Sequence, residues 1–417
     1  TKGGALPGGA IRPGREVSSW LWDYFYLGGA AILLWDCGQV VAILSRREGV
    51  TEVLVRRGHT LEKAVNYEKL TGSISLGDEV VVNTTARSLE LGSGGYDFVI
   101  HIQGRENEGP PHGGHIMKLR YTPCQMSCLT VEEEESPHHK VMASAESLDN
   151  MPVICGSLHS ILPAVAAAVK WRSNWRARLA YIMTDGAALP LSWSKVVAQL
   201  KQHGLLNWTI TVGHAFGGDL EAVNLYSGLL AARHVVAADI AIVCMGPGIV
   251  GTGTRYGFTG IELGEIVNAV SVLGGVAVAV PRISFADGRA RHRGVSHHTL
   301  TALGRVALRP ALISLPILPR EKYIFIRKQL ITAGLWEKHG VAMASGEDAL
   351  QLLESFGIGL STMGRGLGQE REFFAAAAAA GIIAWELYAA NARGVHQGLD
   401  NRWKIAPADP GPPPWSP

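Results

Sequence analysis

The chain has 417 residues, of which 47% are hydrophobic and 18% charged, and its formal net charge is +2. This length is too great for one ordinary core, and the apolar content is sufficient for a large buried sheet. The charge balance excludes a general nucleic-acid coat or an acidic solvating tail, although it allows a local basic pocket. The early apolar run at 27–35 is far shorter than the roughly 20 residues that a bilayer requires, so we expect no membrane association.

The five cysteines indicate a reducing compartment. They form an odd set, three of them lie in apolar stretches, and Cys124 and Cys128 have C-x3-C spacing without a second pair that would complete a zinc site. We therefore expect reduced, mostly buried thiols and a cytoplasmic protein.

The two ends of the chain differ in composition from the rest. Residues 1–35 are rich in glycine and then in aromatic residues (20–26), and we interpret them as a flexible arm, with partner binding as the alternative. Residues 396–417 form a proline-rich tail that we expect to be disordered.

Residues 36–131 are predicted to form a small β-barrel or sandwich domain. Short β-branched or aromatic runs occur at 39–43, 51–55, 79–82 and 96–102, each bounded by turn residues. These runs lack the interleaved basic and aromatic residues that stack on bases, so a structural or oligomerisation role is favoured over oligonucleotide binding. The acidic, histidine-containing stretch at 132–150 is interpreted as a linker, with a metal site as the alternative.

Residues 151–395 are predicted to be an α/β domain with a doubly wound, mostly parallel, Rossmann-like sheet. Short apolar runs alternate with segments of helical period, which is typical of βαβ units around a buried parallel sheet. The expected strands are 153–155, 179–183, 209–212, 240–244, 276–280 and 312–315. The expected helices are 161–171, 193–203, 220–234, 261–273, 299–308, 320–333, 349–356 and 373–392.

The loops that follow these strands are polar and rich in glycine. They are GSLHS at 156–160, TDGA at 184–187, GHAFGGD at 213–219, GPGIVGTGT at 246–254 and the long run at 281–299. Ligands of open α/β sheets bind outside the carboxyl ends of the strands. Structural loops have no reason to concentrate His, Asp, Ser and Gly at one edge, so we predict a ligand-binding cleft there.

The loop at 246–254 could hold an anion. It follows a strand with G-x-G-x-x-G spacing, and its bare backbone and hydroxyl groups could approach a phosphate or carboxylate. The helix expected at about Ile261 starts ten residues late for a dinucleotide site, and no Gly-Lys-Ser/Thr sequence follows. An anion cradle and simple tight turning both remain open. The ligand-binding residues proposed here are Gly246, Gly248, Gly251, Thr252, Gly253 and Thr254.

The last loop adds positive charge and titratable groups. Arginines could clamp an oxyanion, and histidines could transfer protons or ligate a metal. The ligand-binding candidates from this loop are Arg282, Asp287, Arg291, His292 and Arg293, and the catalytic candidates of the whole cleft are Asp185, His214, Asp219, His297 and His298. A divalent metal is compatible with these residues, but no spacing is a metal signature, so the cofactor stays open. Ser296 is equally well explained as a helix cap.

At these loops the sequence resembles the bacterial domain-of-unknown-function 3866 family. The resemblance rests on MTDGAALPL, GHAFGGDLEAVNLYSGLLAARHV, MGPGIVGTGTRYGFTGIELGEI and PRISFADGRARHRGVSHHTLTALGRV, with the earlier GHIMKLRYTP and VEEEESPHH, and runs from about residue 38 to 384. This resemblance implies membership of a family, but it does not imply a reaction. From the residues themselves we expect an enzyme that acts on a small anionic ligand, such as a phosphorylated metabolite or nucleotide. The alternatives are a non-catalytic ligand sensor and a structural or assembly protein. The sequence leaves open whether the protein forms a homo-oligomer, and its charge balance argues against nucleic acid as a partner.

Overall fold

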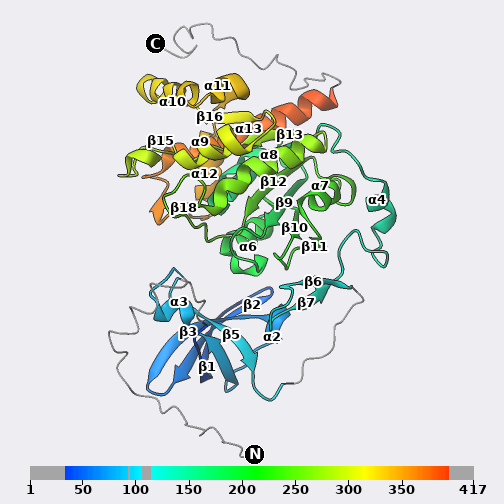
Figure 1. Ribbon diagram of the computed structural model, residues 1–417, viewed down its shortest axis with the longest axis vertical. Helices are drawn as coiled ribbons and strands as arrows, with labels where there is room; N and C mark the ends of the chain where they lie inside the picture. The colour runs from blue at the N-terminus through cyan, green and yellow to red at the C-terminus, as the bar shows by residue number, and fades with distance from the viewer. Residues whose placement is uncertain (1–32, 93, 106–113, 394–417) are drawn as a thin grey trace, which may run out of the picture.

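The computed structural model describes residues 33–92, 94–105 and 114–393. It consists of a closed β-barrel followed by a larger α/β part, with the barrel lying below the α/β part in Figure 1. The aromatic segment at 20–26, nearly all of the expected N-terminal arm and the proline-rich tail lie outside the described residues.

The prediction of a small β-barrel is confirmed. Five strands close in the order β1-β2-β3-β5-β4, and β3 and β5 are parallel, which is the arrangement of OB-type barrels. Strand β3 was not predicted, because its first half is polar and exposed. The elements are β1 (Trp35–Arg47), β2 (Val50–Arg57), β3 (Thr60–Tyr67), α2 (Glu68–Thr71), β4 (Glu79–Asn83), α3 (Thr85–Ser88) and β5 (Asp97–Ile102).

One outer face of the barrel packs against the α/β part. Trp193 of the turn η2 (Leu191–Trp193) has its ring centroid 5.8 Å from that of Tyr96 and 5.9 Å from that of Phe98. Lys195 Nζ lies 2.8 Å from Glu52 Oε1, at the edge of the same contact. These aromatic side chains of the barrel are therefore used in packing between the two parts of the chain.

A short antiparallel pair, β6 (Ile116–Lys118) and β7 (Met126–Cys128), connects the barrel to the α/β part, and α4 (His139–Ser144) follows. Lys118 is fully buried, and its Nζ donates to Glu221 Oε2 at 2.6 Å and to Thr211 O at 3.3 Å. In the acidic run, Glu132 accepts a hydrogen bond from Val223 N at 2.8 Å and Glu133 accepts one from Thr130 N. The connection is thus fixed to the edge of the large sheet by buried polar contacts.

The α/β part contains a sheet of eight parallel strands in the order β11-β10-β9-β12-β8-β13-β16-β17. The six predicted strands are confirmed, and β11 and β17 are added at the two edges. Their bounds are β8 (Pro152–Cys155), β9 (Leu179–Thr184), β10 (Trp208–Val212), β11 (Leu220–Ala222), β12 (Ile240–Met245), β13 (Val276–Ala279), β16 (Leu312–Pro316) and β17 (Gly340–Ala344).

The prediction of one helix over 220–234 was wrong at its start. Residues 220–222 form β11, and the helix begins only at Leu225, because Asn224 Oδ1 accepts from the backbone N–H groups of Tyr226 and Ser227. An edge strand of three residues is too short for a periodicity signal.

Helices cover both faces of the sheet, which confirms the doubly wound class (Figure 1). One face packs against α5 (Leu162–Arg172), α6 (Lys195–Gln202), α12 (Glu347–Ser355) and α13 (Arg371–Ala392). The other packs against α7 (Leu225–His234), α8 (Glu262–Val272), α9 (His297–Thr301), α10 (Arg320–Thr332) and α11 (Leu335–Lys338).

Helix α13 packs closely on α5. A Cβ added at Gly381 would lie 2.7 Å from Ala168 Cβ, so only glycine permits this approach. By length and composition α13 could cross a membrane, but 72% of its most apolar window is buried inside the protein, as in the core helix of a soluble globular protein.

Candidate functional site

The long loop after β13 folds back on itself at the carboxyl edge of the sheet. Strands β14 (Ile283–Ser284) and β15 (Gly294–Val295) pair as an antiparallel hairpin, and the turn between them ends in the short helix η4 (Ala290–His292). Ser296 follows β15 and accepts a hydrogen bond from His298 N, so it caps α9 as the sequence suggested. This fold brings His292 back beside the first turn of α9.

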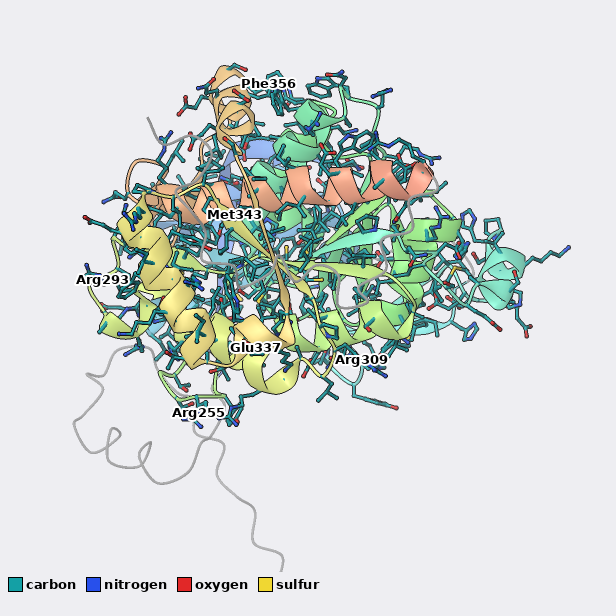
Figure 2. All side chains as sticks on the ribbon, turned by 90° about the horizontal axis from the view of Figure 1, so that it is seen from above. Arg255, Arg293, Arg309, Glu337, Met343 and Phe356 are labelled. Carbon is teal, nitrogen blue, oxygen red and sulfur yellow. The ribbon has the colours of Figure 1, made fainter. Side chains whose placement is uncertain are left out.

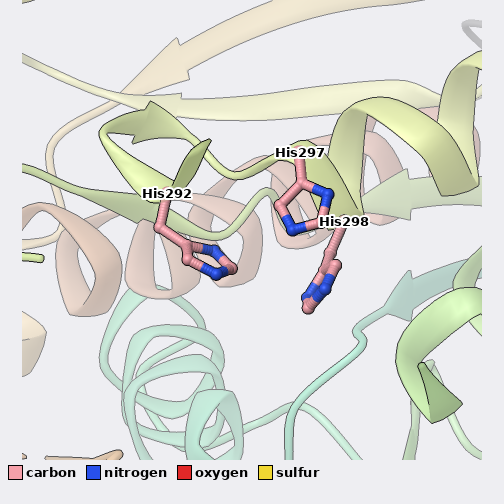
Figure 3. Close-up of side chains that lie close together, drawn as sticks. All are labelled: His292, His297 and His298. Atoms are coloured by element: carbon pink, nitrogen blue, oxygen red, sulfur yellow. The ribbon is translucent and has the colours of Figure 1, made fainter. Parts of the chain in front are cut away.

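Three histidines meet at this point (Figure 3). The ring centroid of His292 lies 4.9 Å from that of His297 and 5.2 Å from that of His298, and the centroids of His297 and His298 lie 4.1 Å apart. One ring nitrogen of each lies within 4.8 Å of the others. Phe258 stacks on His298 with centroids 4.0 Å apart and planes at 11°, which holds that ring in place.

The three imidazoles favour the neutral form. Burial lowers the pKa of His292 to about 4, with a further contribution from the nearby Arg289. Burial also lowers the pKa of His298 to about 4, and His297 adds to the effect. The pKa of His297 is lowered by burial and by Arg291. At neutral pH these side chains therefore present lone pairs rather than positive charge.

A cluster of arginines and carboxylates lies next to the histidines. Asp287 accepts from Arg289 at 2.9 and 2.8 Å and from Arg365 Nη2 at 3.2 Å. The hydrogen bonds from Arg289 hold the pKa of Asp287 well below its usual range. Glu370 is fully buried and lies 2.5 Å from Arg365 Nε. Asp287 and Glu370 thus fix the orientation of the Arg289 and Arg365 side chains.

Arg282 is the buried member of this cluster. It is only 6% exposed, and its Nη1 donates to Thr362 Oγ1 at 3.4 Å. Its Nη2 is buried and lies 3.8 Å from Glu370 Oε1, but within the described residues it has no hydrogen-bond partner. A buried donor without a partner is costly, so this atom marks a place where a ligand acceptor would be stabilising.

A second hairpin, distant in sequence, completes this wall. Strands β18 (Ser361–Thr362) and β19 (Arg365–Gly366) place Thr362 against Arg282 and Ser160, and Arg365 against Asp287. From the sequence, the polar turn at 362–366 was either a part of the cleft or a simple helix-entry turn, and these contacts place it at the site. Neither Arg365 nor Glu370 was among the predicted site residues. Arg289 was also missed, because it lies among several arginines in the loop that no motif distinguishes.

The glycine-rich loop after β12 forms the opposite wall. Gly248 and Gly253 have positive φ angles of 110° and 78°. Thr252 and Thr254 bond to each other at 2.9 Å, and both bond to the backbone of Gly257. Their hydroxyl groups therefore close the loop. Of the ligand-binding residues predicted in this loop, Gly251 and Gly253 line the site.

These walls enclose a pocket of about 100 Å³. A more open hollow of about 470 Å³ shares Gly253 and Arg291 with it and also contacts His297, Arg255 and Arg305. The small pocket is lined by Ser157, Leu158, Ile249, Val250, Gly251, Gly253, Gly260, Arg282, Arg289, Arg291, His292, His298 and Met363.

Two further candidates lie together at a different position on the same edge. Asp185 Oδ2 accepts from His214 N at 2.9 Å, and the ring Nδ1 of His214 accepts from Leu119 N at 3.0 Å. In the described part of the chain, no hydrogen bond joins either residue to the three histidines. Lys201 Nζ donates to Asp219 Oδ1 at 2.6 Å, and Thr209 Oγ1 donates to Asp219 Oδ2. The carboxylate of Asp219 thus makes contacts that stabilise the fold.

Glu262, at the start of α8, lies near Asp185 and was not proposed from the sequence. Thr184 Oγ1 donates to its two carboxylate oxygens at 2.9 and 3.0 Å. Burial raises the pKa of Glu262 to about 7, and Asp185 raises it further. Its only sequence signal was an acidic residue in a first helical turn, which is common without any function.

The two remaining loop arginines differ in position. Arg291 is exposed and lines both cavities, whereas Arg293 lies outside them, with its guanidinium carbon 6.0 Å from the centre of the Phe325 ring. Arg255 and Arg293 both lie at the periphery of the view in Figure 2. Gly246 packs against Ala188 O and, with Gly248, positions the loop from outside the pocket lining.

The family model for "Protein of unknown function (DUF3866)" matches residues 63–381, more than half of the chain. The chain belongs to the DUF3866 family. The part matched to DUF3866 begins within β3 and ends within α13, so it includes every candidate site residue described above. A search among curated proteins gave no match. Membership of DUF3866 brings no activity with it, so function has to be argued from the site.

Proposed function

We propose that this DUF3866 protein is an enzyme that acts on a small anionic substrate, a phosphorylated metabolite or nucleotide, in the pocket beside His292 and His298. The observation that carries the proposal is Arg282. Arg282 lines the pocket, and its buried Nη2, which has no hydrogen-bond partner among the described residues, would be satisfied by an oxyanion.

The charge of the site supports an anionic ligand. Four guanidinium groups (Arg282, Arg289, Arg291 and Arg365) face two carboxylates (Asp287 and Glu370), which leaves two positive charges in excess. Arginine presents planar paired donors that match phosphate and carboxylate oxygens. A dianionic group such as a phosphoryl group would balance this excess.

The two cavities support a substrate with an anionic end and a larger remainder. A pocket of about 100 Å³ is small compared with ordinary ligand sites. The adjoining hollow of about 470 Å³ could take the remainder, and its Arg255, Arg291 and Arg305 would favour further negative charge. This pairing fits a nucleotide or sugar phosphate better than a free inorganic ion.

The neutral histidines favour catalysis over sensing. A ligand sensor needs fixed donors, and the arginines alone would supply them. The imidazoles of His292 and His298 line the same pocket and can accept a proton from the substrate or coordinate one of its atoms. A cytoplasmic setting, where such metabolites are abundant, fits the five unpaired thiols.

The test compares two arginines that are two residues apart. Purified protein would be incubated with nucleoside monophosphates and sugar phosphates while released phosphate and thermal stability are measured. We expect turnover of at least one compound. Arg291→Ala should lose 10- to 100-fold in kcat/KM, since a charged hydrogen bond contributes about 1.5–3 kcal/mol. Arg293→Ala should change kcat/KM by less than about twofold, because its side chain lies outside the pocket.

Equal effects of the two variants would contradict the placement of the substrate. Stabilisation by a ligand without turnover of any compound would contradict the enzymatic role and leave a sensor. A ligand at a hundred times its Kd adds about 2.7 kcal/mol of stability, which a thermal shift readily detects.

A further inference from the structure

Two of the three clustered histidines have a ring nitrogen without a partner. The ring nitrogens His297 Nε2 and His298 Nε2 are buried and have no hydrogen-bond partner within residues 33–92, 94–105 and 114–393. A buried polar atom without a partner destabilises the folded protein. One ring nitrogen of each of the three histidines lies within 4.8 Å of the others, so one shared partner could accept several lone pairs at once.

A metal cation is such a partner. Neutral imidazole, which has a lone pair on one ring nitrogen, is the form that ligates metals. Three histidines with a fourth position left for water or substrate is a known ligand set of catalytic zinc. Nitrogen donors of this kind suit Zn²⁺ and Co²⁺ and do not suit Mg²⁺ or Ca²⁺.

The surroundings of the rings are also those of metal ligands. Ser296 Oγ lies 2.8 Å from His292 Nδ1, which leaves the other ring nitrogen of His292 for coordination. Metal-bound histidines usually have their second nitrogen held in this way. Stacking on Phe258 fixes the ring plane of His298. Two of the three ligands are therefore oriented before an ion binds.

The positive charge of the nearby arginines disfavours a bound cation, and two carboxylates offset part of this charge. Asp287 lies 2.8 Å from Arg289 and 4.0 Å from Arg282, and Glu370 lies 3.8 Å from Arg282. An anionic substrate in the pocket would offset the remainder. Metal and anion should consequently strengthen each other's binding by the same factor.

We propose that His292, His297 and His298 form a binding site for one divalent transition-metal ion, for which Zn²⁺ is the best match. Because His292 and His298 line the pocket, the ion lies at its wall. When bound, such an ion supplies a Lewis acid that polarises a substrate oxygen or lowers the pKa of a bound water. This inference deepens the proposed function by naming the cofactor of the same site.

The experiment measures metal binding without substrate. Apo protein would be titrated with Zn²⁺ by calorimetry and with Co²⁺ by visible absorption, which reports a low-coordinate nitrogen environment. We expect one ion per chain and at least a 100-fold loss of affinity in His297→Ala and in His298→Ala. Ser296→Ala should lose 10- to 100-fold, because it removes the hydroxyl group that orients His292 and caps α9.

His115→Ala is the matched control, because His115, Glu133 and Glu135 form another group whose ligand atoms lie within 4.8 Å. Zinc affinity should be unchanged in this variant. Zinc affinity that is lost in His115→Ala and kept in the two histidine variants would overturn the proposal, as would the lack of Co²⁺ absorption in the wild type. A wild-type protein that binds neither Zn²⁺ nor Co²⁺ would overturn the proposal even if a variant fails to fold.

Arg291→Ala separates this inference from the proposed function. Zinc binding that persists in Arg291→Ala, while the response to phosphorylated compounds is lost, supports the metal site and the anion site separately. Wild-type zinc binding without any response to anions would support the metal site and contradict the proposed substrate. A response to anions without zinc binding would contradict the metal site alone.

Discussion

The raised pKa of Glu262 predicts a specific dependence of stability on pH. Burial raises the pKa of its carboxyl group to about 7 in the folded protein, against 4.5 for an unperturbed glutamate. The folded protein therefore keeps a proton that the unfolded chain releases between these values. The free energy of unfolding consequently decreases as pH rises from about 4.5 to about 7.

The magnitude follows from the difference of 2.5 pH units between 4.5 and about 7. At 1.36 kcal/mol per unit this is roughly 3 kcal/mol, most of which falls between pH 5 and pH 8. Glu262→Gln removes the titration while keeping an acceptor for Met245 N and a partner for Thr184 Oγ1. This variant should be more stable than the wild type at pH 8.

The assay is urea unfolding of both proteins at pH 5 and pH 8, with Glu354→Gln, a change on the exposed side of α12, as the control. Comparing proteins at the same two pH values cancels the titration of other groups. We expect the wild type to lose about 2–3 kcal/mol more than Glu262→Gln between pH 5 and pH 8, and Glu354→Gln to behave like the wild type. The same pH dependence in all three proteins would refute the reasoning.

Two further changes test the packing that positions the loops. Gly213→Ala should lower stability by about 2–4 kcal/mol, because Gly213 has a φ of 64° and its Cβ would lie 2.3 Å from Asp185 Oδ2. The control Gly204→Ala, with a φ of 65° and no atom within 4 Å of its Cβ, should lose only the cost of the backbone angle; equal losses in calorimetric melts would refute the contact. Lys118→Met should lower stability by about 3–5 kcal/mol, because it removes the buried cation that lies 2.6 Å from Glu221 Oε2 and leaves only Lys69, at 3.9 Å, near this carboxylate. Adding Glu221→Gln should recover part of this loss in urea unfolding, and a larger loss in the double variant would contradict the buried pair.

The sequence predicted the architecture well because the central strands are short, apolar and fully buried. The strand ending at Cys155 and the one ending at Met245 have every residue buried, so their hydrophobic runs are unbroken. The edge strand β17 is only half-buried, and β11 has three residues, so neither produces a clear pattern. Burial, and not strand propensity alone, separates the predicted strands from the missed ones.

The candidate site was predictable only where its residues are close in sequence. His292, His297, His298 and Arg282 come from one loop, so its composition drew attention to them. Arg365 reaches Asp287 across 78 residues, which no local pattern reveals. Conversely, the hydroxyl groups of Thr252 and Thr254 are used within their own loop, which residue type could not distinguish from ligand binding.

The most direct test of the anion pocket is anomalous diffraction from a crystal soaked in tungstate, a tetrahedral dianion that resembles phosphate. The account predicts a tungsten peak in the pocket lined by Arg282, Arg289 and Arg291, with an oxygen about 2.7–3.2 Å from Arg282 Nη2. An empty pocket, or peaks confined to arginines outside it such as Arg293, would contradict the claim that this edge of the sheet binds an anionic substrate.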